Sequence, residues 1–215
     1  AVYAAILLHD FGHGPFSHTL EDFFFTNHSH EEVGLALIEQ LNQDFNGKLD
    51  LTLQILRGTY PKGYLHELVS GQLDMDRLDY LRRDSFFSGV TEGNIGSARI
   101  IKMLGVKDDH LVVESTGIYS IENFLTARRL RYWQVYLHKT SVACEKMINN
   151  TLLRAKELAH QGVELFVTPA LRYFLYGNIT REMFFNDEQC LETFTQLDDN
   201  DIWCALKTWA NHEDK

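Results

Sequence analysis

The 215-residue chain has few cysteines and no long apolar run, and these two absences exclude several classes of protein. Its three cysteines, Cys144, Cys190 and Cys204, are too far apart for a disulfide framework or a zinc knuckle. No apolar stretch approaches the roughly 18 residues that a membrane-spanning helix needs. The first residues also lack the basic and then apolar layout of a signal peptide. The sequence therefore predicts a globular cytoplasmic protein with no membrane partner.

A surplus of positive charge is also missing, because the formal net charge is −10. Non-specific binding of nucleic acid depends on many Lys and Arg side chains that neutralise phosphates. Nucleic acid is therefore not expected as the main partner. A small anionic ligand needs only a local cationic pocket, so it remains compatible with this charge.

Helical periodicity covers most of the chain, so the fold is expected to be mostly α. Ser29 and Glu32 form a capping box for a predicted helix over about 30–45. Further helices are expected over 61–70 from Pro61, over 72–84, over 121–159 as one long helix or a kinked pair, from Pro169, and across 187–212. The β-rich runs within 99–115, joined through Asp108 and Asp109, predict a small hairpin.

The chain shows no internal repeat and no linker, so a single domain over 1–215 is expected, with about 160–215 as a helical extension. It begins with "AVYAAILLHD", an apolar helical pattern without a capping residue before it. We therefore expect a fragment whose first part is missing.

Histidines are concentrated near the start, in "LLHDFGHGPFSH" at residues 7–18 and just beyond. Five of the ten, His9, His13, His18, His28 and His30, fall within the first thirty residues. Imidazole and carboxylate ligands such as those of His9 and Asp10 suit iron, zinc, manganese or nickel. The alternative for this pair is a histidine favoured at the end of a helix, followed by a capping aspartate. His28 is assigned no role.

Two other helical stretches place polar groups on one face. Asp76, Tyr80 and Asp84 recur every four residues in "QLDMDRLDYLRRDS", with Arg77 able to reach the same volume. Arg128, Tyr132 and Tyr136 have the same spacing in "ARRLRYWQVYLHK", which is typical of a wall that binds phosphate and sugar. Solvated arginines beside core aromatics are the alternative for the second stretch, and a solvated charged stripe is the alternative for Asp79, Arg82 and Arg83.

The segments "HDFGHGPFSH" and "QLDMDRLDYLRRDS" resemble the two signatures of the HD superfamily of metal-dependent phosphohydrolases. Within it they resemble the enzymes that remove triphosphate from deoxynucleoside triphosphates, over about residues 1–155. The resemblance implies an HD-domain helical bundle with a small β-hairpin. It also implies one divalent ion (Fe, Mn, Ni, Zn or Mg) held by His9, Asp10, Asp76 and a histidine upstream of this chain.

The same resemblance implies roles for the other polar residues. His18 and Glu21, three apart in a helix expected to open at Pro15, match a catalytic pair, and spacing alone lets the carboxylate orient the imidazole. The resemblance implies phosphate contacts or positions near the phosphates for His13, His30, Arg77, Arg128 and Lys139. Simple geometry at the N-terminus of a helix is the alternative for His30. The resemblance also implies contacts with the sugar and its 3′-hydroxyl for Tyr80, Asp84 and Tyr136.

These observations predict an HD-domain phosphohydrolase that converts deoxynucleoside triphosphates to deoxynucleoside and triphosphate. A phosphomonoesterase acting on nucleotides and a non-catalytic regulatory nucleotide-binding module are the alternatives. The resemblance also implies a homo-oligomer. Phe86 and Phe87 stand where the human member of the family has histidines, so those side chains have no phosphate role here.

Overall fold

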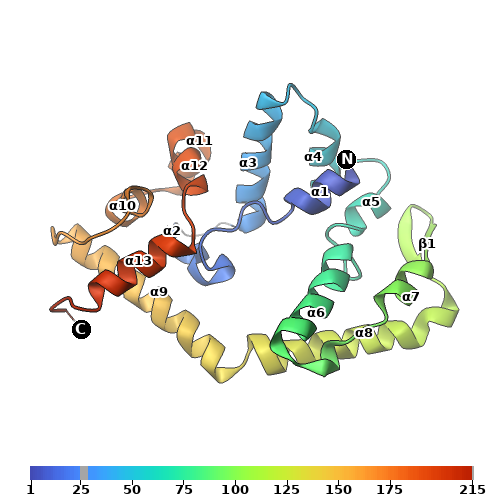
Figure 1. Cartoon of the computed structure of the whole chain (residues 1–215). Helices are drawn as coiled ribbons and strands as arrows, with labels where there is room; N and C mark the ends of the chain where they lie inside the picture. The colour runs from blue at the N-terminus through green and yellow to red at the C-terminus, as the bar shows by residue number, and fades with distance from the viewer. Residues whose placement is uncertain (25–28, 215) are drawn as a thin grey trace. The chain divides into compact units, whose positions relative to one another are not determined.

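The computed structural model describes residues 1–24 and 29–214, most of them in helices (Figure 1). The prediction of a mostly α fold with a small β-hairpin is confirmed. The chain forms two compact units, one of Ala1–His9 and Leu41–Val142, the other of Asp10–Gln40 and Ala143–Lys215. Two helices, α3 (His30–Asp44) and α9 (Lys139–His160), continue from one unit into the other. His28 lies outside the described residues.

The first unit is built from short helices and the hairpin. Its helices are α1 (Val2–Leu8), α4 (Asp50–Leu56), α5 (Tyr64–Glu67), α6 (Met75–Ser88), α7 (Ser97–Lys102) and α8 (Ile118–Arg131). Two 3₁₀ turns, η2 (Thr91–Gly93) and η3 (Ser115–Gly117), and a π-helical turn, η4 (Tyr132–Tyr136), complete its helical elements among the described residues. Strands β1 (Leu104–Lys107) and β2 (His110–Val113) pair antiparallel, with Leu104 opposite Val113.

The apolar faces of these elements form two buried clusters. Ala5 of α1, Ile55 of α4 and Val69 form one cluster. The other cluster joins α6, α7 and α8 through Leu78, Leu81, Ile95, Ile100, Phe124 and Ala127. These two clusters fix the end of α1 and the whole of α6, which are the elements that carry His9 and Asp76.

The second unit has an aromatic core beneath its histidine-rich loop. Its remaining elements are the 3₁₀ turn η1 (Ser17–Leu20) and helices α2 (Glu21–Phe24), α10 (Pro169–Tyr176), α11 (Arg181–Asn186), α12 (Glu188–Thr195) and α13 (Asp199–Trp209). Phe24 lies edge-on to Phe174 and Phe194, with ring centroids 5.3 and 5.5 Å apart. Phe184 meets Phe194 in the same geometry at 5.3 Å. Edge-to-face contacts of this kind stabilise a core beyond the area that they bury.

Some of the predicted elements differ from those of the structure. Residues 99–102 belong to α7 and not to a strand, since Ile100 is completely buried between α6 and α8. Of the two alternatives for 121–159, the kinked pair is confirmed, with α8 and α9 separated by the π turn and residues 137–138. The helix expected from Pro15 begins as the 3₁₀ turn at Ser17. Helices α4 and α11 were not predicted.

Along the described parts of the chain, the helices are too short or too polar to cross a membrane.

Removing the Phe174 ring tests the aromatic core. Phe174 has no exposed surface, so Phe174→Ala should lower the free energy of unfolding by about 3–5 kcal/mol, through lost burial and the cavity left behind. Phe166→Ala is the control, because Phe166 is 56% exposed and should change stability little. Chemical denaturation of both variants measures the difference, and equal effects would contradict the core assignment.

Candidate functional site

His9 ends helix α1 with its ring held in a defined orientation. Its Nδ1 lies 2.7 Å from the carbonyl oxygen of Ile6, so the proton is placed on Nδ1 and the lone pair on Nε2. Nε2 is 3.8 Å from Oδ1 of Asp76. Two ligands of a single ion, each about 2.1 Å from it, lie roughly 3–4 Å apart. The pair therefore has the donor chemistry and separation that one divalent ion requires.

Asp76 is positioned by a buried cap at the start of α6. Asp74 is only 1% exposed, and its carboxylate accepts hydrogen bonds from the backbone N–H of Arg77 at 2.7 Å and of Gly71 at 3.0 Å. The guanidinium of Arg77 also donates to this carboxylate and to the Gly71 carbonyl. Sequence reasoning missed Asp74, although an aspartate directly before a helix is a recognised capping signal.

Asp10 follows His9 directly and is the first residue of the second unit, so the peptide bond keeps it beside the proposed ion. Its Oδ1 is 3.8 Å from Nε2 of His13, on the far side of a short turn. The donor set of His9, Asp10 and Asp76, one imidazole and two carboxylates, suits a divalent metal ion.

Gly12 brings the loop against the first turn of α3. A Cβ on Gly12 would lie 1.9 Å from the His30 carbonyl oxygen and 2.3 Å from the Gly34 nitrogen, so only glycine fits there. As a result, the His13 ring stacks on the His30 ring, with centroids 4.1 Å apart and planes 14° apart. The loop is also attached at Phe16, whose N–H donates to Asp199 of α13 at 2.8 Å.

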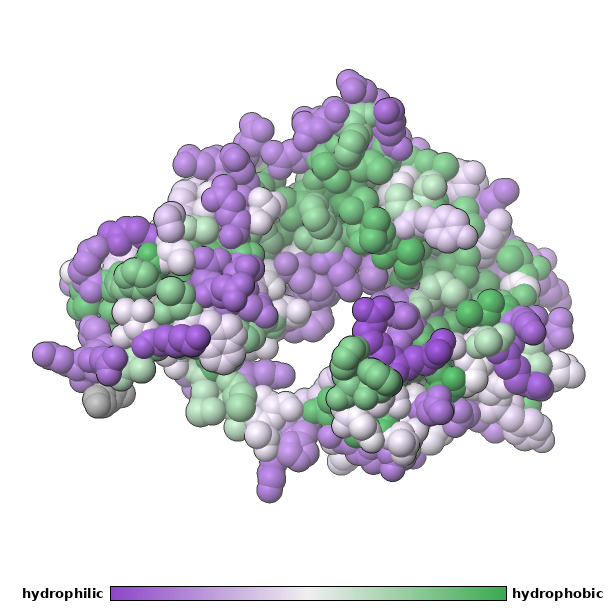
Figure 2. All heavy atoms as spheres, viewed as in Figure 1, coloured by the Kyte–Doolittle hydropathy of each residue, from purple (hydrophilic) through white to green (hydrophobic). Residues whose placement is uncertain are grey.

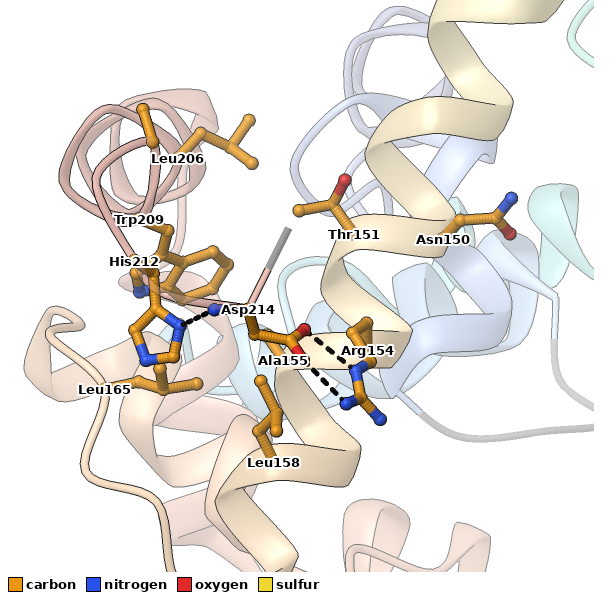
Figure 3. A pocket seen from close by; sticks show the side chains of 11 residues that line it. Asn150, Thr151, Arg154, Ala155, Leu158, Leu165, Leu206, Trp209, His212 and Asp214 are labelled. Carbon is orange, nitrogen blue, oxygen red and sulfur yellow. Dashed lines mark hydrogen bonds and ion pairs between the residues drawn. The ribbon is translucent and has the colours of Figure 1, made fainter.

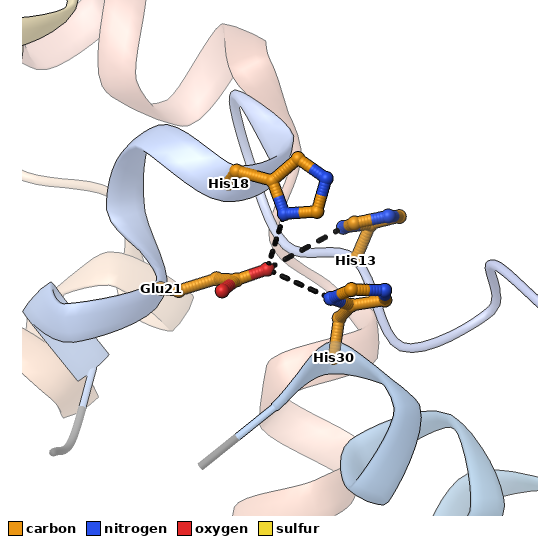
Figure 4. Close-up of side chains that lie close together, drawn as sticks. All are labelled: His13, His18, Glu21 and His30. Atoms are coloured by element: carbon orange, nitrogen blue, oxygen red, sulfur yellow. Dashed lines mark hydrogen bonds and ion pairs between the residues drawn. The ribbon is translucent and has the colours of Figure 1, made fainter. Parts of the chain in front are cut away.

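Glu21 is the centre of a cluster of three imidazoles (Figure 4). Its Oε1 accepts hydrogen bonds from Nδ1 of His18 at 2.7 Å and of His30 at 2.9 Å. The Nδ1 of His13 lies 4.0 Å from the same oxygen and is buried with no hydrogen-bond partner among the described residues. The sequence associated His18 with Glu21, but nothing in the spacing indicated that His30 shares the same oxygen.

The environment of the cluster shifts the pKa of two of its members. Burial alone would raise the pKa of Glu21, but its hydrogen bonds with His18 and His30 and their charges lower it. The pKa of His13 is lowered, first by burial and then by the neighbouring charges of His30 and His18. A carboxylate that stays ionised can orient two imidazoles, and His18, which is 69% exposed, presents its other nitrogen to solvent.

The other end of α6 carries a second pair of polar groups. The hydroxyl of Tyr136 donates to Oδ2 of Asp84. Burial and this carboxylate raise the pKa of Tyr136, so the phenol keeps the proton it donates. Tyr80 lies one turn before Asp84 on the same face and is half-buried, which raises the pKa of its own phenol. The predicted face of Asp76, Tyr80 and Asp84 therefore lies along one helix with Tyr136 at its end.

The remaining predicted residues lie on the surface of the first unit. Arg128 donates to the side-chain oxygen of Gln72 at 3.3 Å, close to the start of α6. Lys139 is exposed at the first position of α9. Phe86 and Phe87 are 81% and 79% exposed. Asp79 pairs with Arg83 at 2.5 Å on the surface, in agreement with the charged stripe offered as the alternative for these residues.

A cavity of about 630 Å³ lies elsewhere in the second unit, between α9 and α13 (Figure 3). Leu158, Leu206 and Trp209 form its apolar lining, and Arg154 pairs with Asp214 at 2.8 Å across it. Its lining includes none of the predicted site residues.

Comparison with known proteins gives the family. Residues 1–84 match the HD domain, and residues 95–166 match the HD associated region. The chain belongs to the HD superfamily of phosphohydrolases. The predicted membership is therefore confirmed, and the HD-domain match contains His9, Asp10, Asp76 and the Glu21 cluster.

Some similar proteins match almost the whole length of this chain. A crystal structure of a phosphohydrolase from Bacteroides thetaiotaomicron is 70% identical, with a TM-score of 0.96, over 99% of this chain and 53% of that one. The uncharacterized protein YwfO of Bacillus subtilis is 32% identical over 98% of this chain and 48% of its own length. A Dictyostelium discoideum deoxynucleoside triphosphate triphosphohydrolase, a SAMHD1 homolog, is 26% identical over 73% of this chain and 34% of its own. The chain thus spans about half the length of the first two proteins.

The metal assignment predicts loss of bound ion when one ligand is removed. His9→Ala and Asp76→Ala should each lower the metal content from one divalent ion per chain to near zero, with helix content unchanged by circular dichroism. Asp79→Ala, on the exposed face of the same helix, should keep the ion. Elemental analysis of protein purified without added metal provides the measurement. Full occupancy in either ligand variant would refute the assignment.

The Glu21 cluster predicts a different result for His18. His18→Ala should retain the ion but lower kcat for hydrolysis of a phosphate ester about 100-fold, which is typical for loss of a general acid. His160→Ala, an exposed histidine outside the cluster, is the matched control. Steady-state kinetics together with elemental analysis separate this outcome from metal loss, and an unchanged kcat would remove His18 from catalysis.

Proposed function

We propose that this chain hydrolyses deoxynucleoside triphosphates to deoxynucleoside and inorganic triphosphate. The observation that carries the proposal is the arrangement of α6: Asp76, a proposed metal ligand, lies near one end, and the Asp84–Tyr136 hydrogen bond lies near the other. Eight residues of α-helix separate the two aspartates by about 12 Å along the axis. A phosphorylated sugar is short enough for its phosphate and its hydroxyl to be bound from the same helix.

At the phosphate end, His9, Asp10 and Asp76 would hold one divalent ion. When bound, such an ion neutralises phosphoryl charge and makes water more acidic. Arg77 and Arg128 would supply further positive charge for the phosphates, since guanidinium groups match the geometry of phosphate oxygens. Lys139, His13 and His30 are proposed to contact the phosphates as well.

His18 is proposed to protonate the 5′-oxygen of the departing deoxynucleoside. Water attacks the α-phosphorus and releases a proton to the solvent, the bond from phosphorus to the 5′-oxygen breaks, and the proton from His18 neutralises the oxygen that leaves. His18 then regains a proton from the solvent. Glu21 holds His18 through the 2.7 Å hydrogen bond. The hydrogen bond fixes the direction of the ring, so the proton does not have to be positioned at the moment of reaction.

At the sugar end, Asp84 is proposed to accept a hydrogen bond from the 3′-hydroxyl, with Tyr80 and Tyr136 packed against the ring. A site built to bond a hydroxyl discriminates strongly against an analogue that lacks it, because its buried polar groups are then unpaired. This feature favours a nucleotide over a simple phosphoester. The Dictyostelium discoideum relative, whose name gives the same reaction, adds support. The chain is proposed to act as a homo-oligomer.

Product analysis tests the reaction. The full-length protein with a divalent ion should convert dNTPs to deoxynucleoside and triphosphate in equal amounts, and should leave dNMPs unchanged. His9→Ala, which lacks a proposed metal ligand, is the blank for contaminating phosphatases. Chromatography of the nucleosides together with phosphorus NMR identifies the products. Inorganic phosphate released from dNMPs would favour a phosphomonoesterase, and binding without turnover would favour a regulatory module.

A further inference from the structure

Arg131 is a completely buried cation at the end of α8, and the proposed reaction assigns it no role. Its guanidinium donates to the hydroxyl of Ser88 and to the carbonyl of Val90, just after the last turn of α6. Its Nε is buried without a hydrogen-bond partner among the described residues. Burial of a charge is unfavourable unless the group is held by several hydrogen bonds, so the buried position of Arg131 depends on these contacts.

The backbone of η2 is shaped to receive this guanidinium. A Cβ on Gly93 would lie 2.1 Å from Nη2 of Arg131, a distance at which the side chain must move. Gly93 has an ordinary backbone conformation, so glycine is needed here for space and not for its dihedral angles.

A chain of hydrogen bonds joins Arg131 to Asp84. Ser88 accepts from Arg131, and its hydroxyl donates to the main-chain carbonyl of Asp84, four residues earlier. The Asp84 carboxylate in turn accepts from Tyr136, five residues beyond Arg131. The segment from Arg131 to Tyr136 is therefore linked to residue 84 in two ways, to its backbone through Ser88 and to its side chain directly through Tyr136.

The π turn makes this double contact possible. In an α-helix, residues five apart point in directions that differ by roughly 140°. Within η4, the N–H of Leu137 donates to the carbonyl of Tyr132 at 2.7 Å, a bond across five residues. The wider turn reduces this divergence, and Arg131 and Tyr136 both contact residues in the last turns of α6. Such turns are frequent at functional sites.

We propose that Arg131 is a positioning residue that, through the π turn, places the Asp84–Tyr136 pair for recognition of the sugar 3′-hydroxyl. This inference rests on the proposed function, because it concerns the sugar end of the same site. Arg131 does not touch the substrate. It fixes the last turn of α6 so that the Asp84 carboxylate and the Tyr136 hydroxyl stay in register.

Three variants and a control test the proposal. Arg131→Met removes the charge but keeps an apolar side chain, a change that buried ionic sites often tolerate without loss of stability. Arg131→Lys keeps the charge and can restore one hydrogen bond. Gly93→Ala displaces the guanidinium without altering Arg131. Arg129→Met, on the exposed face of the same helix, is the matched control.

The decisive kinetic readout is selectivity for the 3′-hydroxyl. In Arg131→Met and Gly93→Ala, KM for a dNTP should rise about 10-fold with little change in kcat, and the preference in kcat/KM over the 3′-deoxy analogue should fall by a similar factor. Arg131→Lys should be intermediate and Arg129→Met unchanged. An equal loss on both substrates would overturn the proposal, because a merely structural defect does not depend on the 3′-hydroxyl.

Amide hydrogen exchange gives a readout that does not depend on activity. Exchange over residues 84–93 should accelerate in Arg131→Met and Gly93→Ala and stay unchanged in Arg129→Met, with residues 118–127 protected in all three. Unchanged exchange over residues 84–93 would overturn the positioning role, whatever the result of the kinetic measurements. If the wild type hydrolyses no dNTP, the proposed function fails, while the exchange result still decides whether Arg131 orders this turn.

Discussion

The close approach of Gly12 to the first turn of α3 is the constraint on which the histidine cluster depends. With the two backbones in contact there, the His13 ring lies stacked on the ring of His30, and both rings come within reach of Glu21. A single carboxylate oxygen then serves two imidazoles and lies near a third. A larger residue at position 12 would push the loop from α3 and separate these groups, even though it alters none of them chemically.

Helix α6 has an equivalent constraint at each end. The buried Asp74 carboxylate fixes its first turn and holds Arg77, while the segment from Arg131 to Tyr136 contacts its last turns. A helix attached at both ends and packed through Leu78 and Leu81 behaves as a rigid support. Groups projecting from such a support lose little entropy when they meet a ligand, which is the physical benefit of building a site on regular structure.

The electrostatics of the chain fit a small polyanionic ligand held locally. With a net charge of −10, the chain has no excess of positive charge to attract phosphate over a broad surface. The guanidinium groups of Arg77 and Arg128 are instead directed by Asp74 and Gln72. Oriented cations of this kind suit the proposed phosphate site, and a bound divalent ion would add the charge that the side chains do not supply.

The sequence by itself determined the helical fold, the hairpin near Asp108, the capping serine at position 29 and the shared face of Asp76, Tyr80 and Asp84, because these follow from contacts between residues near in the chain. It also carried the motifs that identify the HD domain. Only tertiary structure decided that residues 99–102 are helical, that His30 shares Glu21 with His18 and that Arg131 lies against Gly93. Each of these features depends on packing between segments that are not neighbours in the sequence. The contacts that stabilise them come from residues that the local sequence pattern does not identify.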